Sequence, residues 1–143
     1  MVEVYDNRPQ IKKDFKGTIE VKKHHQLQEL QDQIKIVKEA KERFVQAHKF
    51  WKREENELKQ LTRDSKELDI NLRAYVTKAE LKTEERKTNC EHTEKIVNIE
   101  KQNLKNLIKK HKEEIQAIKK KMFLVLEQER ERIAREKAVM ESM

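Results

Sequence analysis

From Ile19 to Met143 the chain contains neither glycine nor proline, and this absence constrains its fold more than any other feature. The one glycine, Gly17, and the one proline, Pro9, both precede that stretch. Strong helix formers such as lysine, glutamate, glutamine and leucine fill it. Chains with 43% charged and 35% hydrophobic residues are often disordered, but disordered chains are rarely so poor in proline and glycine. We therefore predict an all-α protein made of very long, amphipathic coiled-coil helix.

Apolar residues at heptad spacing predict which face of the helix is buried. In the first half this seam comprises Leu27, Leu30, Ile34, Val37, Phe44 and Trp51, with Lys41 interrupting it. In the second half it comprises Val97, Leu104, Leu107, His111, Ile115, Ile118 and Met122. Residues 82–95 lack strong apolar side chains and contain several poor helix formers. The pattern divides the chain into an extended N-terminal segment at 1–17, helical segments at 18–81 and 96–143, and a weak seam or turn at 82–95.

Two architectures fit this division. In the first, the helix continues as one rod that lies along a partner. In the second, the chain folds into an antiparallel helical hairpin that turns near residues 85–89. This turn would set Phe44 opposite Leu126 and Trp51 near Lys119, so that the two regions richest in large apolar residues meet. Against it, the segment has none of the glycine or proline that usually marks a short turn between helices.

The N-terminal segment differs in pattern from the rest of the chain. Residues 2–5 alternate like a short strand, and Arg8-Pro9 is expected to prevent a helix. We predict that the helix begins at Thr18, as its N-cap. One interpretation of the preceding residues is a frayed terminus. The other is an extended clip, whose side chains occupy pockets of a partner protein. The clip residues are Tyr5, Ile11 and Phe15.

Five consecutive apolar residues form the most hydrophobic stretch of the chain. This apolar run comprises Met122, Phe123, Leu124, Val125 and Leu126. At about 100° per residue, the five side chains point to every side of a helix. A single neighbouring helix covers only one stripe of such a surface. We therefore expect the apolar run to bind a partner in addition to packing within the chain.

Most of the net positive charge lies in one part of the second helical segment. Residues 101–121 contain eight lysines and two glutamates, in a chain whose net charge is +7. Five of these lysines share one side of a helix. This basic stripe comprises Lys101, Lys105, Lys109, Lys112 and Lys119. Either it contacts the acidic surface of another protein, or it is a solvated face that keeps the chain in solution.

Three aromatic side chains, Phe44, Phe50 and Trp51, lie close together in the sequence. An aromatic cluster of this kind is typical of the anchors of protein–protein interfaces. It is also typical of a wide layer in the core of a coiled coil. The sequence supports both interpretations, and we treat the cluster as a candidate partner-binding site.

Nothing in the sequence indicates catalysis, a cofactor or a metal. No two histidines are four residues apart, and Cys90 with His92 has no second pair to complete a tetrahedral zinc site. A single cysteine favours a small seam residue in a reducing compartment. Neither a signal peptide nor a membrane-spanning apolar run is present, so we expect a soluble cytoplasmic protein. Basic and acidic residues alternate, which argues against sequence-specific nucleic-acid binding.

In style, the whole chain resembles the small coiled-coil proteins of ciliary and flagellar doublet microtubules. The resemblance rests on the short N-terminus with Tyr5 and Arg8-Pro9, on the long lysine- and glutamate-rich helix, and on the ending Leu126–Glu136. It involves no specific motif and carries over no functional residue. The resemblance implies binding to tubulin and to neighbouring coiled-coil proteins of the axoneme, in the lumen or on the outer wall. Tubulin surfaces are acidic, which suits the basic stripe.

We therefore expect a non-enzymatic structural or scaffolding protein of the cytoskeleton, which docks through its long helix onto an acidic surface of a larger assembly. Two other functions fit the same sequence. One is a coiled-coil subunit of another cytoplasmic complex, such as a tether, a kinetochore or a motor adaptor. The other is nonspecific nucleic-acid binding through Lys101–Lys121, which would weaken strongly with salt.

Overall fold

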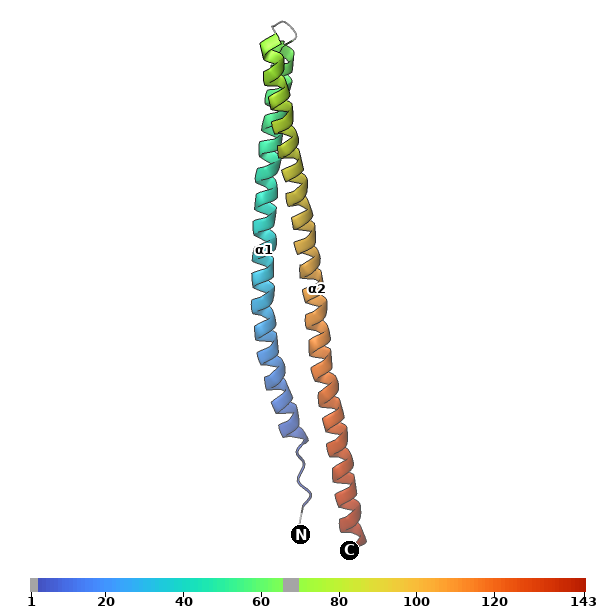
Figure 1. Cartoon of the computed structure of the whole chain (residues 1–143). Coiled ribbons are helices and arrows are strands. Elements are labelled where there is room, and N and C mark those ends of the chain that lie inside the picture. Colours follow the sequence, from blue (N-terminus) through green and yellow to red (C-terminus); the bar gives the residue numbers. More distant parts are fainter. Residues whose placement is uncertain (1–2, 66–69) are drawn as a thin grey trace. The chain divides into compact units, whose positions relative to one another are not determined.

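The computed structural model of the protein is an all-α antiparallel hairpin (Figure 1). Helix α1 spans Arg8–Ser65 and helix α2 spans Ile70–Ser142. The structure describes the backbone of residues 3–65 and 70–143 and the side chains of residues 3–64 and 73–143. The predicted all-α class is confirmed. Of the two architectures that fit the sequence, the hairpin is observed and the continuous rod is not.

The hairpin divides into two compact units, each of which pairs a stretch of α1 with a stretch of α2. Unit 1 contains Met1–Gln31 and Asn106–Met143, and unit 2 contains Asp32–Lys105. Each unit has its own contacts between the helices, and these contacts establish which residues of α1 lie level with which residues of α2.

Polar contacts define this antiparallel register in both units. In unit 1, Gln26 Nε2 donates to the backbone carbonyl of His111 at 3.0 Å. In unit 2, Lys82 Nζ lies 3.2 Å from Glu54 Oε1. Unit 1 also contains a contact of Asn7 with Glu129, and unit 2 one of Gln33 with Glu100, so within each unit the partner's number falls along α2 as the residue number rises along α1. In each unit, therefore, the stretch of α1 and the stretch of α2 run antiparallel.

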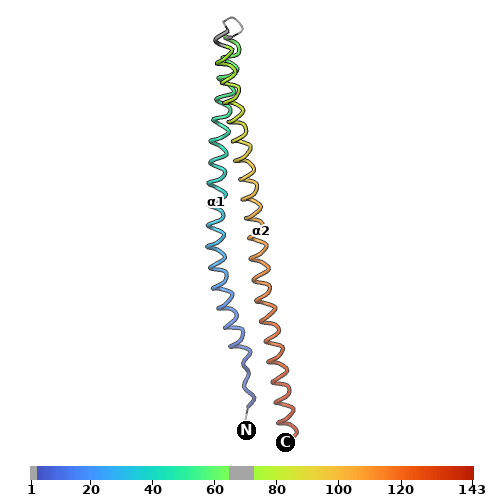
Figure 2. Tube along the Cα trace, viewed as in Figure 1, coloured from blue at the N-terminus to red at the C-terminus, as the bar shows by residue number. Residues whose placement is uncertain are grey.

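The predicted turn near residues 85–89 is wrong, because these residues lie inside α2. Figure 2 shows the trace of α2 coiling without a break through residues 82–95. The two helices are instead separated by residues 66–69, which belong to the predicted helical segment 18–81 and lie outside the described residues. The predicted pairings of Phe44 with Leu126 and of Trp51 with Lys119 required the turn at 85–89 and are wrong with it.

Two threonines of residues 82–95 direct their hydroxyl groups to carbonyls within α2. The Thr83 hydroxyl donates to the carbonyl of Ala79 at 2.8 Å, and the Thr93 hydroxyl donates to the carbonyl of Cys90 at 2.8 Å. Such bonds keep the threonine side chains from competing for other backbone groups. Since the segment also lacks glycine and proline, its low helix propensity does not end the helix.

The same segment faces the large aromatic side chains of α1 within unit 2. Phe44 and Trp51 are half-buried and lie level with Thr93 and Arg86, whereas Cys90 is buried. Of these α2 residues, Thr93 and Cys90 are small, which leaves room beside the half-buried rings of α1. The low hydrophobicity of residues 82–95 therefore does not mark a turn, because the segment is helical and lies beside half-buried rings of α1.

Helix α1 begins at Arg8, which corrects the predicted start at Thr18. The Asn7 carbonyl accepts the first helical hydrogen bond from the N–H of Ile11, at 2.9 Å. Pro9 lies in the first turn, where its missing N–H would have had no helical partner and its fixed φ suits the helix. Among the described residues of the predicted extended segment 1–17, only residues 3–7 are not helical.

The buried face of α1 differs from the predicted seam in one of its two rows. Both the prediction and the structure include the row with Leu30, Val37, Phe44 and Trp51. The second row was predicted to contain Leu27, Ile34 and Lys41. In the structure it comprises Gln26, Gln33, Ala40 and Ala47 instead.

The predicted and the observed row of α1 differ in the side chains that they would bury, and this difference explains which row faces α2. The predicted row is interrupted by Lys41, and burying a lysine without a partner is costly. The observed row buries Ala40 at the corresponding position, with 3% of its surface exposed. Its glutamines are hydrogen-bonded, since Gln33 Nε2 donates to the carbonyl of Glu100 at 3.1 Å. The outcome is that Leu27 and other large apolar side chains stay outside the helix pair.

The heptad spacing shifts in both helices of unit 1. On α2 the half-buried positions Glu114, Ile118 and Met122 follow one another in steps of four, and on α1 the half-buried Phe15 and Ile19 are also four apart. A step of this kind adds to the heptad and locally unwinds the supercoil. The shift rotates the buried face of α2 just where the apolar run begins.

Candidate interaction surfaces

The apolar run lies in α2 within unit 1, and its side chains divide between two environments. Met122, Val125 and Leu126 are half-buried. Phe123 and Leu124 are exposed, with 64% and 65% of their surfaces accessible. The hairpin therefore covers part of the run and leaves two large adjacent side chains in solvent. Partner binding by these two residues stays a prediction.

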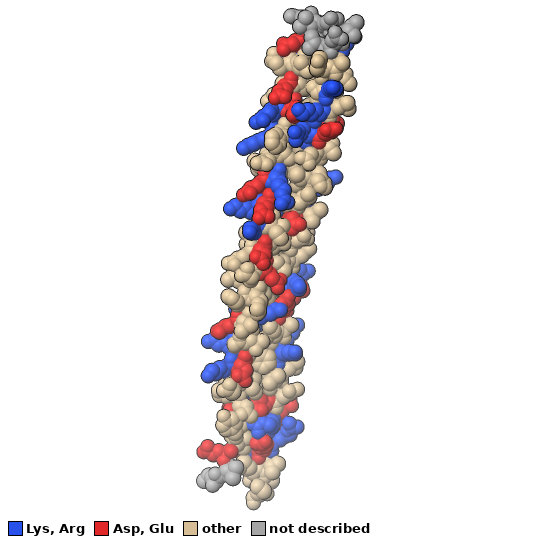
Figure 3. All heavy atoms as spheres, turned by 60° about the vertical axis from the view of Figure 1, so that its left-hand side comes forward, with Lys and Arg blue, Asp and Glu red and all other residues tan. Residues whose placement is uncertain are grey.

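The basic stripe is exposed along its whole length. Unit 1 contains Lys109, Lys112 and Lys119, and unit 2 contains Lys101 and Lys105. On the face drawn in Figure 3, basic and acidic side chains lie beside one another, as the alternating sequence predicts. Lysines in solvent are free to meet an external anionic surface, but their exposure alone does not identify that surface.

The aromatic cluster is partly internal to unit 2. Phe44 and Trp51 are half-buried on the seam, which supports the interpretation as a wide core layer for these two rings. Phe50 is exposed, and its ring lies 5.1 Å from Arg86 Cζ and 5.9 Å from Arg53 Cζ. Such cation–π contacts stabilise an exposed ring without burying it. Phe50 is thus the member of the cluster best placed to bind a partner, which stays a prediction.

The predicted clip residues occupy two kinds of position. Tyr5 belongs to the short non-helical segment and is 73% exposed. Ile11 and Phe15 lie within α1 and are half-buried, so they do not belong to an extended clip. The correction follows from the earlier helix start, because residues 8–17 are helical. Of the three residues, Tyr5 is the one that the structure leaves open to a partner.

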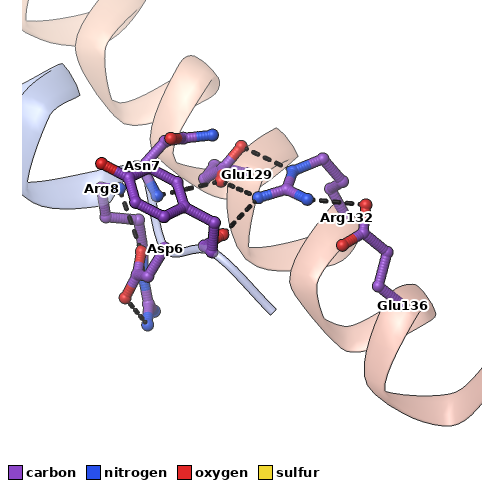
Figure 4. A network of polar contacts seen from close by, with 7 residues as sticks. Asp6, Asn7, Arg8, Glu129, Arg132 and Glu136 are labelled. Carbon is purple, nitrogen blue, oxygen red and sulfur yellow. Dashed lines mark hydrogen bonds and ion pairs between the residues drawn. The ribbon is translucent and has the colours of Figure 1, made fainter. Parts of the chain in front are cut away.

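A network of charged groups attaches the N-terminal segment to α2 in unit 1 (Figure 4). Arg132 Nη2 donates to the carbonyl of Tyr5 at 2.7 Å and to Glu129 Oε1, and Nη1 donates to Glu136 Oε1 at 2.7 Å. The backbone N–H of Asn7 donates to Glu129 Oε1 at 3.3 Å. The hydrogen bonds from Arg132 lower the pKa of Glu129, and those to Glu129 and Glu136 raise the pKa of Arg132.

The residues at the start of α1 add the ion pair between Asp6 and Arg8 to this N-terminal network. Asp6 accepts hydrogen bonds from the backbone N–H of Arg8 at 3.0 Å and from its guanidinium at 2.9 Å and 2.8 Å. These bonds lower the pKa of Asp6 to about 2. Glu129 and Arg132 were not predicted as contact residues, because their spacing of three predicts only a local pair on one helix.

We expect the N-terminal network to release the segment on acidification. Asp6 and Glu129 both have a lowered pKa in the folded state. The contribution of both carboxylates is therefore present above their ordinary pKa of about 4. That of Asp6 is lost as the pH falls through about 2, and that of Glu129 is lost as the pH falls below its ordinary pKa. The hydrogen-exchange protection of the Asn7 amide, followed by NMR, is expected to disappear over that range. Arg132→Gln is expected to remove it at neutral pH, and protection that persists in this variant would contradict the assignment.

A polar group is buried between the helices of unit 1 at His111. The ring is 5% exposed, and its Nε2 lies 3.3 Å from Glu29 Oε2. Its Nδ1 has no hydrogen-bond partner among the described residues. A buried polar atom left without a partner costs free energy that an apolar side chain of similar size would not cost.

His111→Leu is therefore expected to stabilise the protein. Leucine fills the same seam position, and the variant should gain about 1–2 kcal/mol in the free energy of unfolding. Urea denaturation followed by circular dichroism measures the change. Gln128→Leu, at an exposed position of α2, is the matched control and should change stability little. A destabilised His111→Leu variant would show that the imidazole makes a favourable contact that leucine cannot replace.

Cys90 is a buried seam residue of unit 2, as the sequence predicts. Burial raises the pKa of its thiol, and the nearby carboxylates of Glu94 and Glu91 raise it further. The thiolate is the reactive form of cysteine. A buried thiol with a raised pKa is therefore a poor nucleophile toward molecules in solution, whereas a second thiol placed beside it within the helix pair can still be oxidised with it to a disulfide.

Neither a metal site among the described residues nor a relative points to the function of this chain. Within residues 3–65 and 70–143, no group of three or more histidine, cysteine or acidic side chains is arranged to hold a metal ion. None of the described helical segments is both long enough and apolar enough to cross a membrane. Comparison with models of known protein families, with curated proteins and with solved structures finds no match. The exposed surfaces of α1 and α2 are therefore the features from which a function can be inferred.

Proposed function

We propose that this protein is a non-enzymatic structural protein of the cytoskeleton, which docks as a helical hairpin onto an acidic surface of a larger assembly. The observation that carries this proposal is that α2 exposes all five lysines of the basic stripe together with Phe123 and Leu124. Exposed lysines attract an anionic surface over distance, and adjacent large apolar side chains add short-range affinity once they are buried.

The exposed apolar residues favour a protein partner over nonspecific nucleic-acid binding. Contacts with a phosphate backbone depend mainly on charge and weaken steeply with salt. Phe123 and Leu124 contribute little to such contacts, whereas their burial in a protein interface is favourable at any ionic strength. The combination of the basic stripe with these two side chains therefore supports docking on a protein.

The assembly that we propose is the doublet microtubule of a cilium or flagellum. The chain resembles the small coiled-coil proteins of that structure in style, and tubulin presents acidic surfaces that suit the lysines. The partners would then be tubulin and neighbouring coiled-coil proteins. The alternative with the same docking chemistry is a coiled-coil subunit of another cytoplasmic complex, in which a different acidic protein takes the place of tubulin.

Fractionation of cilia tests this proposal. Cells that express the tagged protein are deciliated, and the axonemes are extracted first with detergent and then with high salt. We expect the protein to stay in the doublet pellet through both steps, because apolar contacts persist when salt screens charges. Release by salt alone would contradict apolar docking. Absence from cilia would contradict the microtubule assignment and favour a different cytoplasmic complex.

A further inference from the structure

Within unit 1, a groove opens along one side of the helix pair. It has a volume of about 450 Å³. Both helices contribute to it, and each contributes apolar as well as polar side chains. The lining residues are Lys23, Gln26, Leu27, Leu30, Ile108, His111, Lys112, Ile115 and Gln116.

The apolar part of this groove exists because of the seam that α1 uses. Since Gln26 occupies the buried row, Leu27 is left 54% exposed beside it. On α2, Ile108 is 40% exposed, and Ile115 is half-buried one heptad further along. Side chains from both helices thus form an apolar floor that neither helix covers.

The length of this apolar floor matches the spacing of the apolar side chains on one face of an additional helix. Ile108 and Ile115 are seven residues apart, which corresponds to about 10.5 Å along α2. An amphipathic helix places side chains at i, i+3 or i+4, and i+7 over the same distance. A helix lying between Leu27 and Ile108 would bury side chains that the hairpin leaves in solvent.

The charge around the groove selects an acidic occupant. Two lysines, Lys23 and Lys112, are among the nine lining residues, and none of the nine is acidic. Residues 106–121 of α2 carry six lysines against two glutamates. One of these glutamates, Glu114, is already paired with Lys22, whose Nζ lies 2.6 Å from Glu114 Oε2. The hydrogen bond from Lys22 lowers the pKa of Glu114, so this carboxylate stays charged and engaged.

The same charges argue against a second copy of this chain as the occupant. A two-fold symmetric contact places the same patch on both subunits. Lys23 and Lys112 of one copy would then face the same lysines of the other. Like charges placed opposite one another in an interface weaken it.

We propose that the groove binds an amphipathic helix of an acidic partner protein, with aliphatic side chains between Leu27 and Ile108 and carboxylates facing Lys23 and Lys112. This assignment names the partner's contact element for the docking role proposed above and rests on that role. It differs from docking through Phe123 and Leu124, which are not among the groove residues.

A synthetic peptide tests this assignment on the full chain. The probe is a fluorescein-labelled helix of about 20 residues, with leucines at heptad a and d positions and glutamates at most others. Fluorescence anisotropy is expected to show binding to the wild-type protein. Leu27→Gln combined with Ile108→Gln should reduce the affinity at least tenfold. Val21→Gln combined with Ile99→Gln is the matched control, since both side chains are exposed and lie outside the groove, and it should leave the affinity unchanged.

A charge exchange separates specific binding from nonspecific hydrophobic binding. Lys23→Glu combined with Lys112→Glu should weaken binding of the glutamate peptide and allow binding of a peptide with lysines in place of the glutamates. Circular dichroism checks that each variant keeps its helix content. No binding of the glutamate peptide, or equal binding by the Leu27→Gln, Ile108→Gln variant, would overturn the assignment.

Two further measurements keep this assignment distinct from the docking role itself. Sedimentation of the wild-type protein as a dimer that the Leu27→Gln, Ile108→Gln variant abolishes would place a second copy in the groove and overturn the proposal. In fractionated cilia, loss of this variant from the doublet pellet would support it. A variant that stays in the pellet as firmly as the wild type would overturn the groove assignment and leave the docking role intact.

Discussion

Replacing Glu85 with proline is expected to lower the free energy of unfolding by at least about 3 kcal/mol. The residue lies in the interior of α2, where proline removes the hydrogen bond to the carbonyl four residues earlier and its ring clashes with that carbonyl. The Glu85 side chain is exposed, so no buried contact is lost with it. Urea denaturation followed by circular dichroism measures the loss.

Glu85→Ala is the control for this substitution, because it removes the same side chain and keeps the backbone N–H. Alanine favours helix at least as well as glutamate, so the control should be as stable as the wild type. A turn at residues 85–89 would accept proline with little loss. Equal stability of the proline and alanine variants would therefore contradict the continuous helix through this segment.

Phe123→Ser combined with Leu124→Ser is expected to abolish retention of the protein in the doublet pellet. Burial of two such side chains contributes about 1.5–3 kcal/mol each to an interface, which together corresponds to a loss of at least about 100-fold in affinity. Because both side chains are exposed in the hairpin, the substitutions should leave its stability unchanged. Fractionation of cilia with blotting of the pellet measures retention.

Lys105→Gln combined with Lys109→Gln provides the comparison. Exposed ion pairs contribute about 0–1 kcal/mol and are screened by salt, so this variant should weaken retention only a few-fold. The reverse order, with loss after the lysine changes and full retention after the serine changes, would show that charge alone holds the protein in place. Docking through the apolar run would then be excluded.

Backbone propensity was sufficient to predict the helices but not where the chain turns. The absence of glycine and proline after Ile19 predicted helix through both α1 and α2, which the structure shows. The turn was misplaced because residues 82–95 are weakly hydrophobic. On α1 this segment is paired with a stretch that contains the half-buried rings of Phe44 and Trp51, and pairing across helices is not visible in a single hydropathy pattern.

The polar row of the seam on α1 was also not predicted from the sequence. Hydrophobicity favours Leu27 and Ile34 over Gln26 and Gln33, but the glutamines are the residues that face α2. Their burial is acceptable because each amide donates to a carbonyl of α2. An acceptor more than sixty positions away in the sequence cannot be inferred from local spacing. The groove beside Leu27 exists because Gln26, and not Leu27, lies in the buried row of α1. The hydrophobic pattern therefore did not predict the groove either.

The candidate sites were predictable to different degrees. Periodicity predicted that the basic stripe shares one side of α2, and all five lysines are exposed. The N-terminal network was missed because Tyr5 and Arg132 are distant in the sequence and meet only when the helices pair. The sequence likewise did not predict which apolar side chains, such as Phe123, stay exposed. Their exposure depends on how α2 is rotated about its own axis in the helix pair.

The register of the hairpin is the central claim, and a single cysteine substitution tests it most directly. Contacts around Phe50 and Glu54 place Ala47 level with Cys90, and both residues are buried in unit 2. Ala47→Cys is expected to form an intramolecular disulfide with Cys90 under mild oxidation, detected by mass spectrometry of the monomer. Val45→Cys, at an exposed position, is expected to form none. Efficient cross-linking of Ala47→Cys alone would agree with this register, whereas no cross-link, or equal cross-linking of both variants, would contradict it.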